Sequence, residues 1–492
     1  MTDSPDHSTE VSGRRAAREG AAGRAATASP IAGVQAVIAK HPTVWLFSAI
    51  GVVFLLLATG SLFAGIASGS GRAEMVPLPA GSEAPPRTQP SAVPAGTHLR
   101  TCSIASAAAL PDLGTLAASV VNANTGEVLF DRAGATPAPT GSVLKILTAA
   151  AALKILGPSA QLSTKVIDGS SKGTIVLVGG GDPTLATVSN SFYEGAPLIS
   201  DLATAAMAAY KLKHPGDPVT QIVLDSTLWS PSDNWDPSWP VSERADGYLG
   251  LVTALQVDGD RSDPTQAESA RGEDPIGRAG QAFADAAGLE NVTFTRGAAV
   301  GTTVLAEVKS QPLSTLIGQM LLTSDNTLAE SIARVAAKTA GMDGGSASVG
   351  QLIPAALKDL GLDTTGLVIK DGSGESADNA VPPLFVSRLL VKIRANEADL
   401  GVIYTGMPVG GETGDLYDRF TGANEVAKGK VVAKPGWIDN ERSLAGVINA
   451  ADGTPLTFAF YGMGETISFA TREALDTLTT AAYTCGNNLS NN

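Results

Sequence analysis

Two kinds of hydrophobic pattern follow one another along the chain after residue 115. Apolar-rich runs at 116–121 and 128–130 flank a polar turn around Gly126, which predicts a β-hairpin. A segment rich in leucine, isoleucine and alanine then opens at Ser142 and continues to a glycine–proline pair at 157–158, which ends a helix. The pattern therefore predicts strand, strand and helix in that order, with a serine at the start of the helix.

The pattern changes between residues 158 and 311. Short strand-like runs at 174–180 and 221–225 alternate with turn clusters rich in glycine, proline and aspartate. Helical spacing is confined to 198–212 and 275–289 within this stretch. We interpret residues 158–311 as an inserted α+β module.

Helical spacing resumes at Pro312 and continues to about residue 341. Three strand-like runs follow at 430–438, 442–450 and 456–464, and a last helical segment covers 471–483. The segments 101–157 and 312–485 are therefore expected to form one domain that the insertion interrupts.

The region before residue 101 predicts a membrane anchor. Residues 44–68 carry no charge and are long enough to cross a bilayer, which takes about 20 residues. Arginine and lysine residues precede them, so the positive-inside rule places the tail 1–43 in the cytoplasm, where we expect it to be disordered. Residues 69–100 are rich in Pro, Ala, Gly and Ser and are expected to form an extracytoplasmic linker. The predicted location is the bacterial cell membrane, with a single span.

Composition limits the classes of function. A chain of 492 residues with 44% hydrophobic and 17% charged residues is ordinary for globular protein and suffices for two or three packed units. The net charge of −14 argues against nucleic acid as a partner, because binding it requires clustered Lys and Arg.

Cysteine and histidine are scarce. The two cysteines, Cys102 and Cys485, lie near the two ends of the predicted folded part, and they either form one disulfide or remain two buried thiols. None of the four histidines falls in a motif that could orient a serine or bind zinc. No metal and no cofactor are therefore predicted, and the base available to a nucleophilic serine is lysine.

Three short motifs suggest acyl-transfer chemistry: Ser142-x-x-Lys145, Ser324-Asp325-Asn326 and Lys434-Pro435-Gly436. Residues at i and i+3 share one helix face, and a lysine in a dry site beside another cation has a lowered pKa and can accept a serine proton. The helix N-terminus adds N–H donors where an oxyanion would develop. The second motif offers a hydroxyl and an amide that can relay a proton and orient the base. A lysine on an edge strand can attract a substrate carboxylate.

These motifs resemble those of the penicillin-binding protein and serine β-lactamase superfamily, whose third motif is K-T-G. "PTGSVLKILTAAAAL", "GGGDPTL", "TSDNTLAESIARVAA" and "DGSGESADNAVPP" are most similar to class C low-molecular-mass penicillin-binding proteins. These are D-alanyl-D-alanine carboxypeptidase/endopeptidases of the penicillin-binding protein 4-like family. The resemblance covers roughly residues 100 to 485. It implies an α/β (α+β) transpeptidase-like fold, an antiparallel sheet flanked by helices, with a large α+β insertion.

The resemblance also implies partners and roles. The partners are peptidoglycan stem peptides ending in D-Ala, with β-lactam antibiotics as inhibitors. Ser142 would be the acylated nucleophile and Lys145 its general base. Ser324 would pass a proton to the leaving D-alanine, and Asn326 would hold the substrate amide and Lys145. The substrate-binding set is Asp325, Lys434, Gly436 and Trp437, in which Lys434 would meet the terminal carboxylate and the N–H groups of Ser142 and Trp437 would form the oxyanion hole.

Pro435 departs from the family pattern, which has threonine there. In that family the threonine hydroxyl helps to bind the substrate carboxylate, and proline offers neither a hydroxyl nor an N–H. Losing one hydrogen bond to a charged group costs about 1.5–3 kcal/mol. An edge strand tolerates proline, so the fold is not threatened. Ser443 is the sequence's candidate for a substitute hydroxyl.

Two alternatives remain open. Pro435 is consistent with a catalytically weak protein of the same fold that binds or scaffolds the cell wall. A β-lactamase is the other, because Glu375 and Asn379 match the spacing of a deacylating glutamate. The long separation of Ser142 from Ser324 argues against it, since it leaves room for an insertion that β-lactamases lack. Asp371 and Ser373 in the same stretch are either turn residues or part of the active-site wall.

Overall fold

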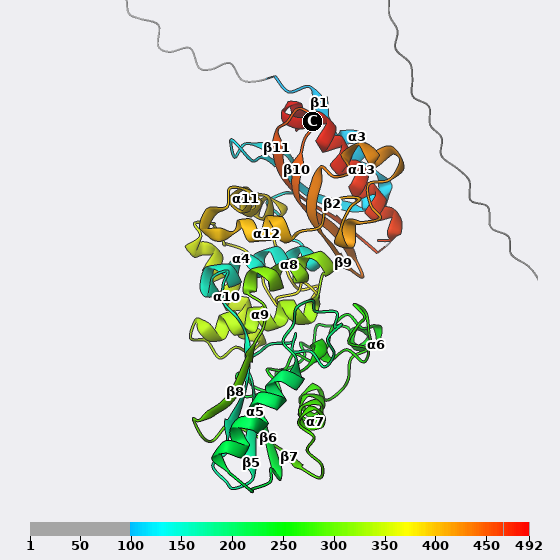
Figure 1. Cartoon of the computed structure of the whole chain (residues 1–492). Helices are drawn as coiled ribbons and strands as arrows, with labels where there is room; N and C mark the ends of the chain where they lie inside the picture. The colour runs from blue at the N-terminus through cyan, green and yellow to red at the C-terminus, as the bar shows by residue number, and fades with distance from the viewer. Residues whose placement is uncertain (1–98, 466, 492) are drawn as a thin grey trace, which may run out of the picture. The chain divides into compact units, whose positions relative to one another are not determined.

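The computed structural model describes residues 99–465 and 467–491 (Figure 1). The predicted tail 1–43, the predicted anchor 44–68 and nearly all of the predicted linker 69–100 lie outside these residues. Within the described ranges, no helix combines the length and the apolar character that a membrane span needs.

An antiparallel sheet is built from the last strands of the chain, in the order β11-β10-β9, so β9 lies at its edge. The hairpin β2–β3 accompanies it, with β2 packed beside β11. The hairpin and the three successive strands predicted from the sequence are confirmed. The strands are β2 (Thr115–Asn122), β3 (Val128–Arg132), β9 (Val431–Ile438), β10 (Glu441–Asn449) and β11 (Pro455–Met463).

Helices cover both faces of this sheet. Side chains point alternately to the two faces along each strand, and at 443–448 of β10 both sets are buried. Leu444 of β10 is buried in a core that it shares with α13 (Phe469–Cys485). The next residue, Ala445, is buried in a second core that it shares with α11 (Pro383–Arg394). An antiparallel sheet flanked by helices is the architecture expected from the sequence.

The second core centres on α4 (Leu144–Leu156), which follows Ser142. Every residue from 144 to 153 is buried, and a helix that is apolar all round is typically enclosed by other elements. Its alanines let the neighbouring helices approach closely. These neighbours, seen together in the middle of Figure 1, are α8 (Leu313–Thr323), α9 (Asn326–Thr339), α10 (Ser346–Asp359) and α12 (Gly401–Gly406).

Between α4 and α8 the chain forms a second sheet with the order β7-β6-β5-β4-β8. The β5–β6–β7 pairs are parallel and both pairs of β4 are antiparallel. Helices α5 (Ile199–Lys213) and α7 (Pro275–Ala287) pack with it around a separate core, and α6 (Ser242–Asp246) lies in a long irregular stretch. The strands are β4 (Ser163–Asp168), β5 (Thr174–Gly179), β6 (Gln221–Asp225), β7 (Thr293–Arg296) and β8 (Val304–Lys309).

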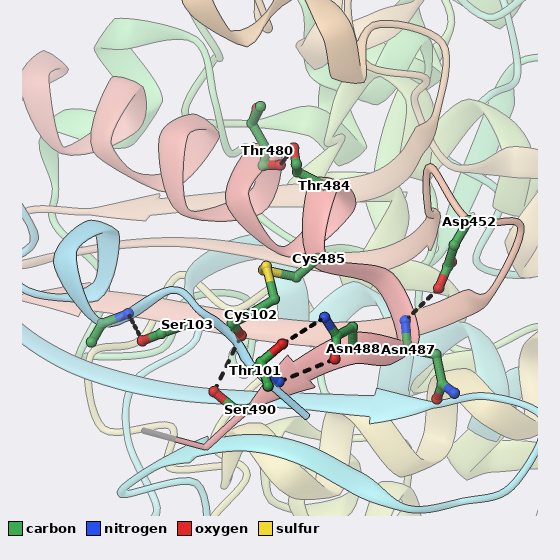
Figure 2. Close-up of a disulfide and its surroundings, with 11 residues drawn as sticks. Thr101, Cys102, Ser103, Asp452, Thr480, Thr484, Cys485, Asn487, Asn488 and Ser490 are labelled. Atoms are coloured by element: carbon green, nitrogen blue, oxygen red, sulfur yellow. Dashed lines mark hydrogen bonds between the residues drawn. A yellow bond between two sulfur atoms is a disulfide. The ribbon is translucent and has the colours of Figure 1, made fainter. Parts of the chain in front are cut away.

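A disulfide joins the two ends of the described chain. Cys102 and Cys485 are bonded, with their Cα atoms 5.4 Å apart, and they lie 383 positions apart in the sequence. Figure 2 shows Cys485 at the end of α13 reaching the short strand β1 (Cys102–Ser103), which pairs in parallel with β12 (Leu489–Ser490). Of the two alternatives from the sequence, the disulfide is confirmed.

One predicted element differs. The sequence pattern predicts helical structure from 312 to about 341, but the helix breaks at Ser324, whose φ is 59°. Asp325 then caps α9, since its Oδ1 accepts the backbone N–H of Leu328 at 2.8 Å. The second motif therefore lies in the bend between two helices and not inside one.

Candidate active site

Ser142 lies in a tight turn directly before α4. Residues Gly141–Val143 form a single 3-10 turn, and Gly141 has a φ of 46°, which favours glycine. A Cβ atom on Gly141 would lie only 2.7 Å from the backbone nitrogen of Trp437. The turn is therefore packed against the end of β9, which brings the first and third motifs together.

Lys145 extends its amine towards Ser142 and not into solvent. Its Nζ lies 2.8 Å from Ser142 Oγ, 2.6 Å from Asn326 Oδ1 and 2.7 Å from the carbonyl oxygen of Ser373. The side chain is fully buried. Burial, followed by the positive charge of Lys434, lowers the pKa of Lys145 to about 7. A substantial fraction of the lysine is thus neutral near pH 7 and able to accept the Ser142 proton.

The bend that carries the second motif faces Ser142 and Lys145. Asn326 is the first residue of α9; its Oδ1 accepts from Lys145, and its Nδ2 donates to Glu375 Oε2 at 3.0 Å. Ser324 lines the same cavity as Ser142. The structure therefore brings Ser324 and Asn326 to the Ser142–Lys145 pair, as the sequence predicts.

Asp325 has partners within the protein. Its Oδ2 accepts from Arg261 Nη2 at 2.7 Å and from the hydroxyl of Tyr193 at 2.9 Å, while its Oδ1 accepts the N–H of Leu328. Arg261 and Arg271 hold the pKa of Asp325 at about 2 although burial acts in the opposite direction. Asp325 lines the cavity, so its place in the substrate-binding set stays a prediction, while its carboxylate fixes the bend to the insertion.

The third motif forms the wall along β9. Lys434 is fully buried, and its Nζ donates to Asp415 Oδ2 at 3.1 Å and to the carbonyl oxygen of Pro435 at 3.0 Å. A Cβ atom on Gly436 would lie 2.9 Å from the backbone nitrogen of Ser142, so strand and serine turn meet without a side chain between them. The Trp437 side chain is 57% exposed at the mouth of the site.

Ser443 does not provide the substitute hydroxyl suggested above. Its Oγ is buried in β10 and donates to the carbonyl oxygen of Thr140 at 2.7 Å. This bond supports the turn that holds Ser142. The hydroxyl missing at Pro435 must therefore be replaced by another group or by none.

The stretch from Asp371 to Asn379 forms a further wall. Asp371 accepts from Trp239, from Asn379 and from two backbone N–H groups, which makes it the anchor of the loop. The carbonyl of Ser373 points to Lys145. Glu375 lines the cavity, and burial, with the like charge of Glu243, raises its pKa to about 7. The sequence left Asp371 and Ser373 open between turn residues and active-site wall; the structure shows both buried behind the cavity, where Asp371 anchors the loop and the Ser373 carbonyl contacts Lys145.

A cavity of about 1140 Å³ joins these walls. Groups of three or more His, Cys, Asp or Glu side chains that could bind a metal do not occur among the described residues. The residues around the cavity include Ser142, Ser324, Asn326, Glu375, Gly436 and Trp437. A serine whose neighbouring base is a buried lysine, in a cavity with an edge strand along one side, defines a serine acyl-transfer site.

Comparisons with known proteins agree with this class. The model of the D-Ala-D-Ala carboxypeptidase 3 (S13) family matches residues 101–300 and 287–482. Carboxypeptidase DacB of Mycolicibacterium smegmatis is 33% identical over 466 residues, 91% of this chain and 99% of that protein. A carboxypeptidase of Mycobacterium tuberculosis is 32% identical over 395 residues, 78% of this chain and 84% of that protein.

The fold also matches a solved structure. The crystal structure of penicillin binding protein 4 from Haemophilus influenzae superposes with a TM-score of 0.62 and 19% identity, covering 75% of this chain and 95% of that one. The chain belongs to the D-Ala-D-Ala carboxypeptidase 3 (S13) family. It is a serine-type D-Ala-D-Ala carboxypeptidase with the penicillin-binding fold and an insertion.

The environment of Lys145 predicts a pH profile. Only the neutral amine can accept the Ser142 proton, so the acylation rate should rise as pH increases through about 7 and then level off. The negative charge of Glu375 raises the pKa of Lys145. Glu375→Gln should therefore move the rise to lower pH. Stopped-flow acylation by a fluorescent penicillin measures both profiles.

A second variant controls for the charge of the cavity. Asp439 lines the same cavity, but it is not one of the main charges that shift the pKa of Lys145. Asp439→Asn should leave the midpoint of the rise in place. Equal profiles for wild type and Glu375→Gln would contradict the assignment of the titrating group to Lys145.

Proposed function

We propose that the chain acts as a D-alanyl-D-alanine carboxypeptidase and endopeptidase on peptidoglycan stem peptides, through an acyl-enzyme on Ser142 that β-lactams also form. The contact that carries this proposal is the 2.8 Å approach of Lys145 Nζ to Ser142 Oγ in a fully buried site. Family membership supports the substrate class. A related fold has been solved as a complex of penicillin binding protein 4 from Haemophilus influenzae with a β-lactam.

The geometry supports an acyl-transfer sequence. Neutral Lys145 takes the proton of Ser142, and the Oγ atom attacks the carbonyl carbon of the penultimate D-alanine. The backbone N–H groups of Ser142 and Trp437 stabilise the oxyanion, because the turn and the strand hold them side by side. The C–N bond then breaks, and the leaving amine receives a proton through Ser324. Water hydrolyses the ester on Ser142 to release the shortened peptide.

Asn326 and Lys434 prepare this site. Asn326 orients the lysine with its carbonyl oxygen, and its amide nitrogen ties the lysine to Glu375. The positive charge of Lys434 contributes to the low pKa of Lys145. Together they keep the base uncharged and aimed at the serine.

The proposed location is the outer face of the cytoplasmic membrane. The uncharged run 44–68 and the basic residues before it support a single span with a cytoplasmic N-terminus. The disulfide between Cys102 and Cys485 is consistent with an oxidising compartment. A membrane-impermeant labelled β-lactam should label the protein on intact cells, and labelling only after lysis would contradict this location.

One acylation experiment tests the function. Purified protein is incubated with a fluorescent penicillin, and the modified residue is mapped by mass spectrometry, with Ser142→Ala as the control. We expect the label on Ser142 and none on the variant. Release of D-alanine from a stem pentapeptide and cleavage of a cross-linked dimer then measure the two activities separately. Labelling without either cleavage would favour a wall-binding role, and no labelling would overturn the proposal.

A further inference from the structure

Four cationic side chains, on β9, β10, α13 and the chain before β9, lie at or directly behind one wall of the active-site cavity. Three of them have a carboxylate partner: Lys434 with Asp415 at 3.1 Å, Arg419 with Asp476 at 2.6 Å, and Arg472 with Asp418 at 2.7 Å. The fourth, Arg442, takes part in none of the ion pairs found within the described residues.

The guanidinium of Arg442 is held in place but lacks a partner. It lies over the Trp437 ring, 4.7 Å from the ring centroid, and its Nε is buried without a hydrogen-bond acceptor among the described residues. The neighbouring Glu441 does not neutralise it, because burial raises the pKa of Glu441 to about 8 and leaves that carboxyl protonated at neutral pH. Arg419 and Arg472 both repel it and lower its pKa, as burial does. Among the described residues, no carboxylate therefore forms an ion pair with this guanidinium.

Arg442 lies on the sheet face that carries Trp437 and Pro435 in the cavity of the catalytic serine. Arg442 lies directly opposite Trp437 in the β9–β10 register, and directly opposed residues share one face of a sheet. Pro435, two residues before Trp437, shares that face as well. Pro435, Trp437 and Arg442 all line the cavity that contains Ser142.

Other donors along this strand are already engaged. Lys434 is buried and paired with Asp415, and the hydroxyl of Ser443 donates to the Thr140 carbonyl. Pro435 has no hydroxyl and no N–H. The anion of a bound peptide would meet an unpaired guanidinium here, and a guanidinium binds a carboxylate through two parallel hydrogen bonds.

We propose that Arg442 binds the α-carboxylate of the C-terminal D-alanine, so that it takes the part of the hydroxyl that Pro435 lacks and selects peptides with a free C-terminus. This inference rests on the proposed function and specifies how the site recognises its substrate. Arg442 is a binding residue and takes no part in the proton transfers.

The experiment compares two substrates that differ only in the charge of the C-terminal group: an acyl-D-Ala-D-Ala peptide with a free carboxylate and the same peptide with a C-terminal amide. Arg442→Gln should lower kcat/KM for the free acid by about 10-fold or more, the effect of losing a charge-assisted hydrogen bond. The amide should be cleaved at the wild-type rate to within about twofold, because it offers no carboxylate to the guanidinium. Arg442→Lys should recover part of the loss, since it keeps the charge.

Arg472→Gln is the matched control, because it removes a cation of the same wall that Asp418 already neutralises. Its preference for the free acid over the amide should change far less than that of Arg442→Gln. An unchanged preference in Arg442→Gln, or an equal loss on both substrates, would overturn the assignment of Arg442. Failure of the proposed function is distinct, because the wild type would then cleave neither peptide and Ser142 would take no penicillin label.

Discussion

Lys145→Met should slow the acylation of Ser142 by about 100-fold to 10,000-fold, the range expected when a positioned general base is lost. The reason is geometric, because the lysine amine lies 2.8 Å from the serine oxygen and is the group with a lowered pKa in contact with it. Methionine fills a similar volume in the buried site without a proton acceptor. Stopped-flow fluorescence with a labelled penicillin measures the acylation rate.

Lys145→Arg tests whether acylation depends on proton acceptance by residue 145 or only on its positive charge. Arginine keeps a cation near Asn326 and the Ser373 carbonyl, but its guanidinium stays protonated and cannot accept a proton. We therefore expect this variant to acylate as slowly as Lys145→Met. A rate near that of the wild type would show that charge alone suffices and that Lys145 is not the base.

Arg261→Met should lower the free energy of unfolding by about 3–5 kcal/mol, because it leaves the buried Asp325 carboxylate without its cation. Both side chains of this pair are only 2% exposed. Arg261 also packs against the rings of Phe192 and Tyr193. Because Asp325 fixes the bend that carries Ser324 and Asn326, the acylation rate should fall as well. Urea unfolding followed by circular dichroism measures the first effect.

An exposed pair provides the comparison. Arg296 and Asp274 form an ion pair whose side chains are 57% and 54% exposed. Pairs of this kind contribute about 0–1 kcal/mol, so Arg296→Met should change stability little. Equal losses in the two variants would contradict the structural importance of the Arg261–Asp325 pair.

Short-range patterns sufficed to predict the elements around the catalytic pair. Ser142 and Lys145 are three positions apart on one turn, so their contact follows from helix geometry once the helix is placed. The strand with Lys434 could be predicted equally well. Three strand-like runs follow one another there, separated by short turns, and this pattern has few other interpretations. That the three motifs lie together in one site was predicted only from the family resemblance. No local sequence pattern specifies which strand edge packs against which helix.

The contributions of the insertion could not be predicted. Arg261, Tyr193 and Trp239 reach the active-site loops from stretches whose composition indicates only turns. Their partners Asp325 and Asp371 lie far along the sequence, and long-range pairing of this kind leaves no periodicity. The break at Ser324 was missed for a related reason, because an aspartate inside a helical pattern is a cap only if the preceding residue leaves the helix. Arg442 carries no motif, and only its missing partner distinguishes it.

The disulfide between Cys102 and Cys485 determines which element of the folded domain bears a force applied at its N-terminal end. Tension arriving at Thr101 meets a two-residue strand pairing, β1 with β12, which would peel apart one hydrogen bond at a time. The sulfur–sulfur bond transfers that tension at once to the end of α13, whose inner face is buried against the sheet. In the membrane-anchored arrangement proposed above, the catalytic domain would therefore resist a pull from its N-terminal side without losing its first strands, for as long as the disulfide stays oxidised.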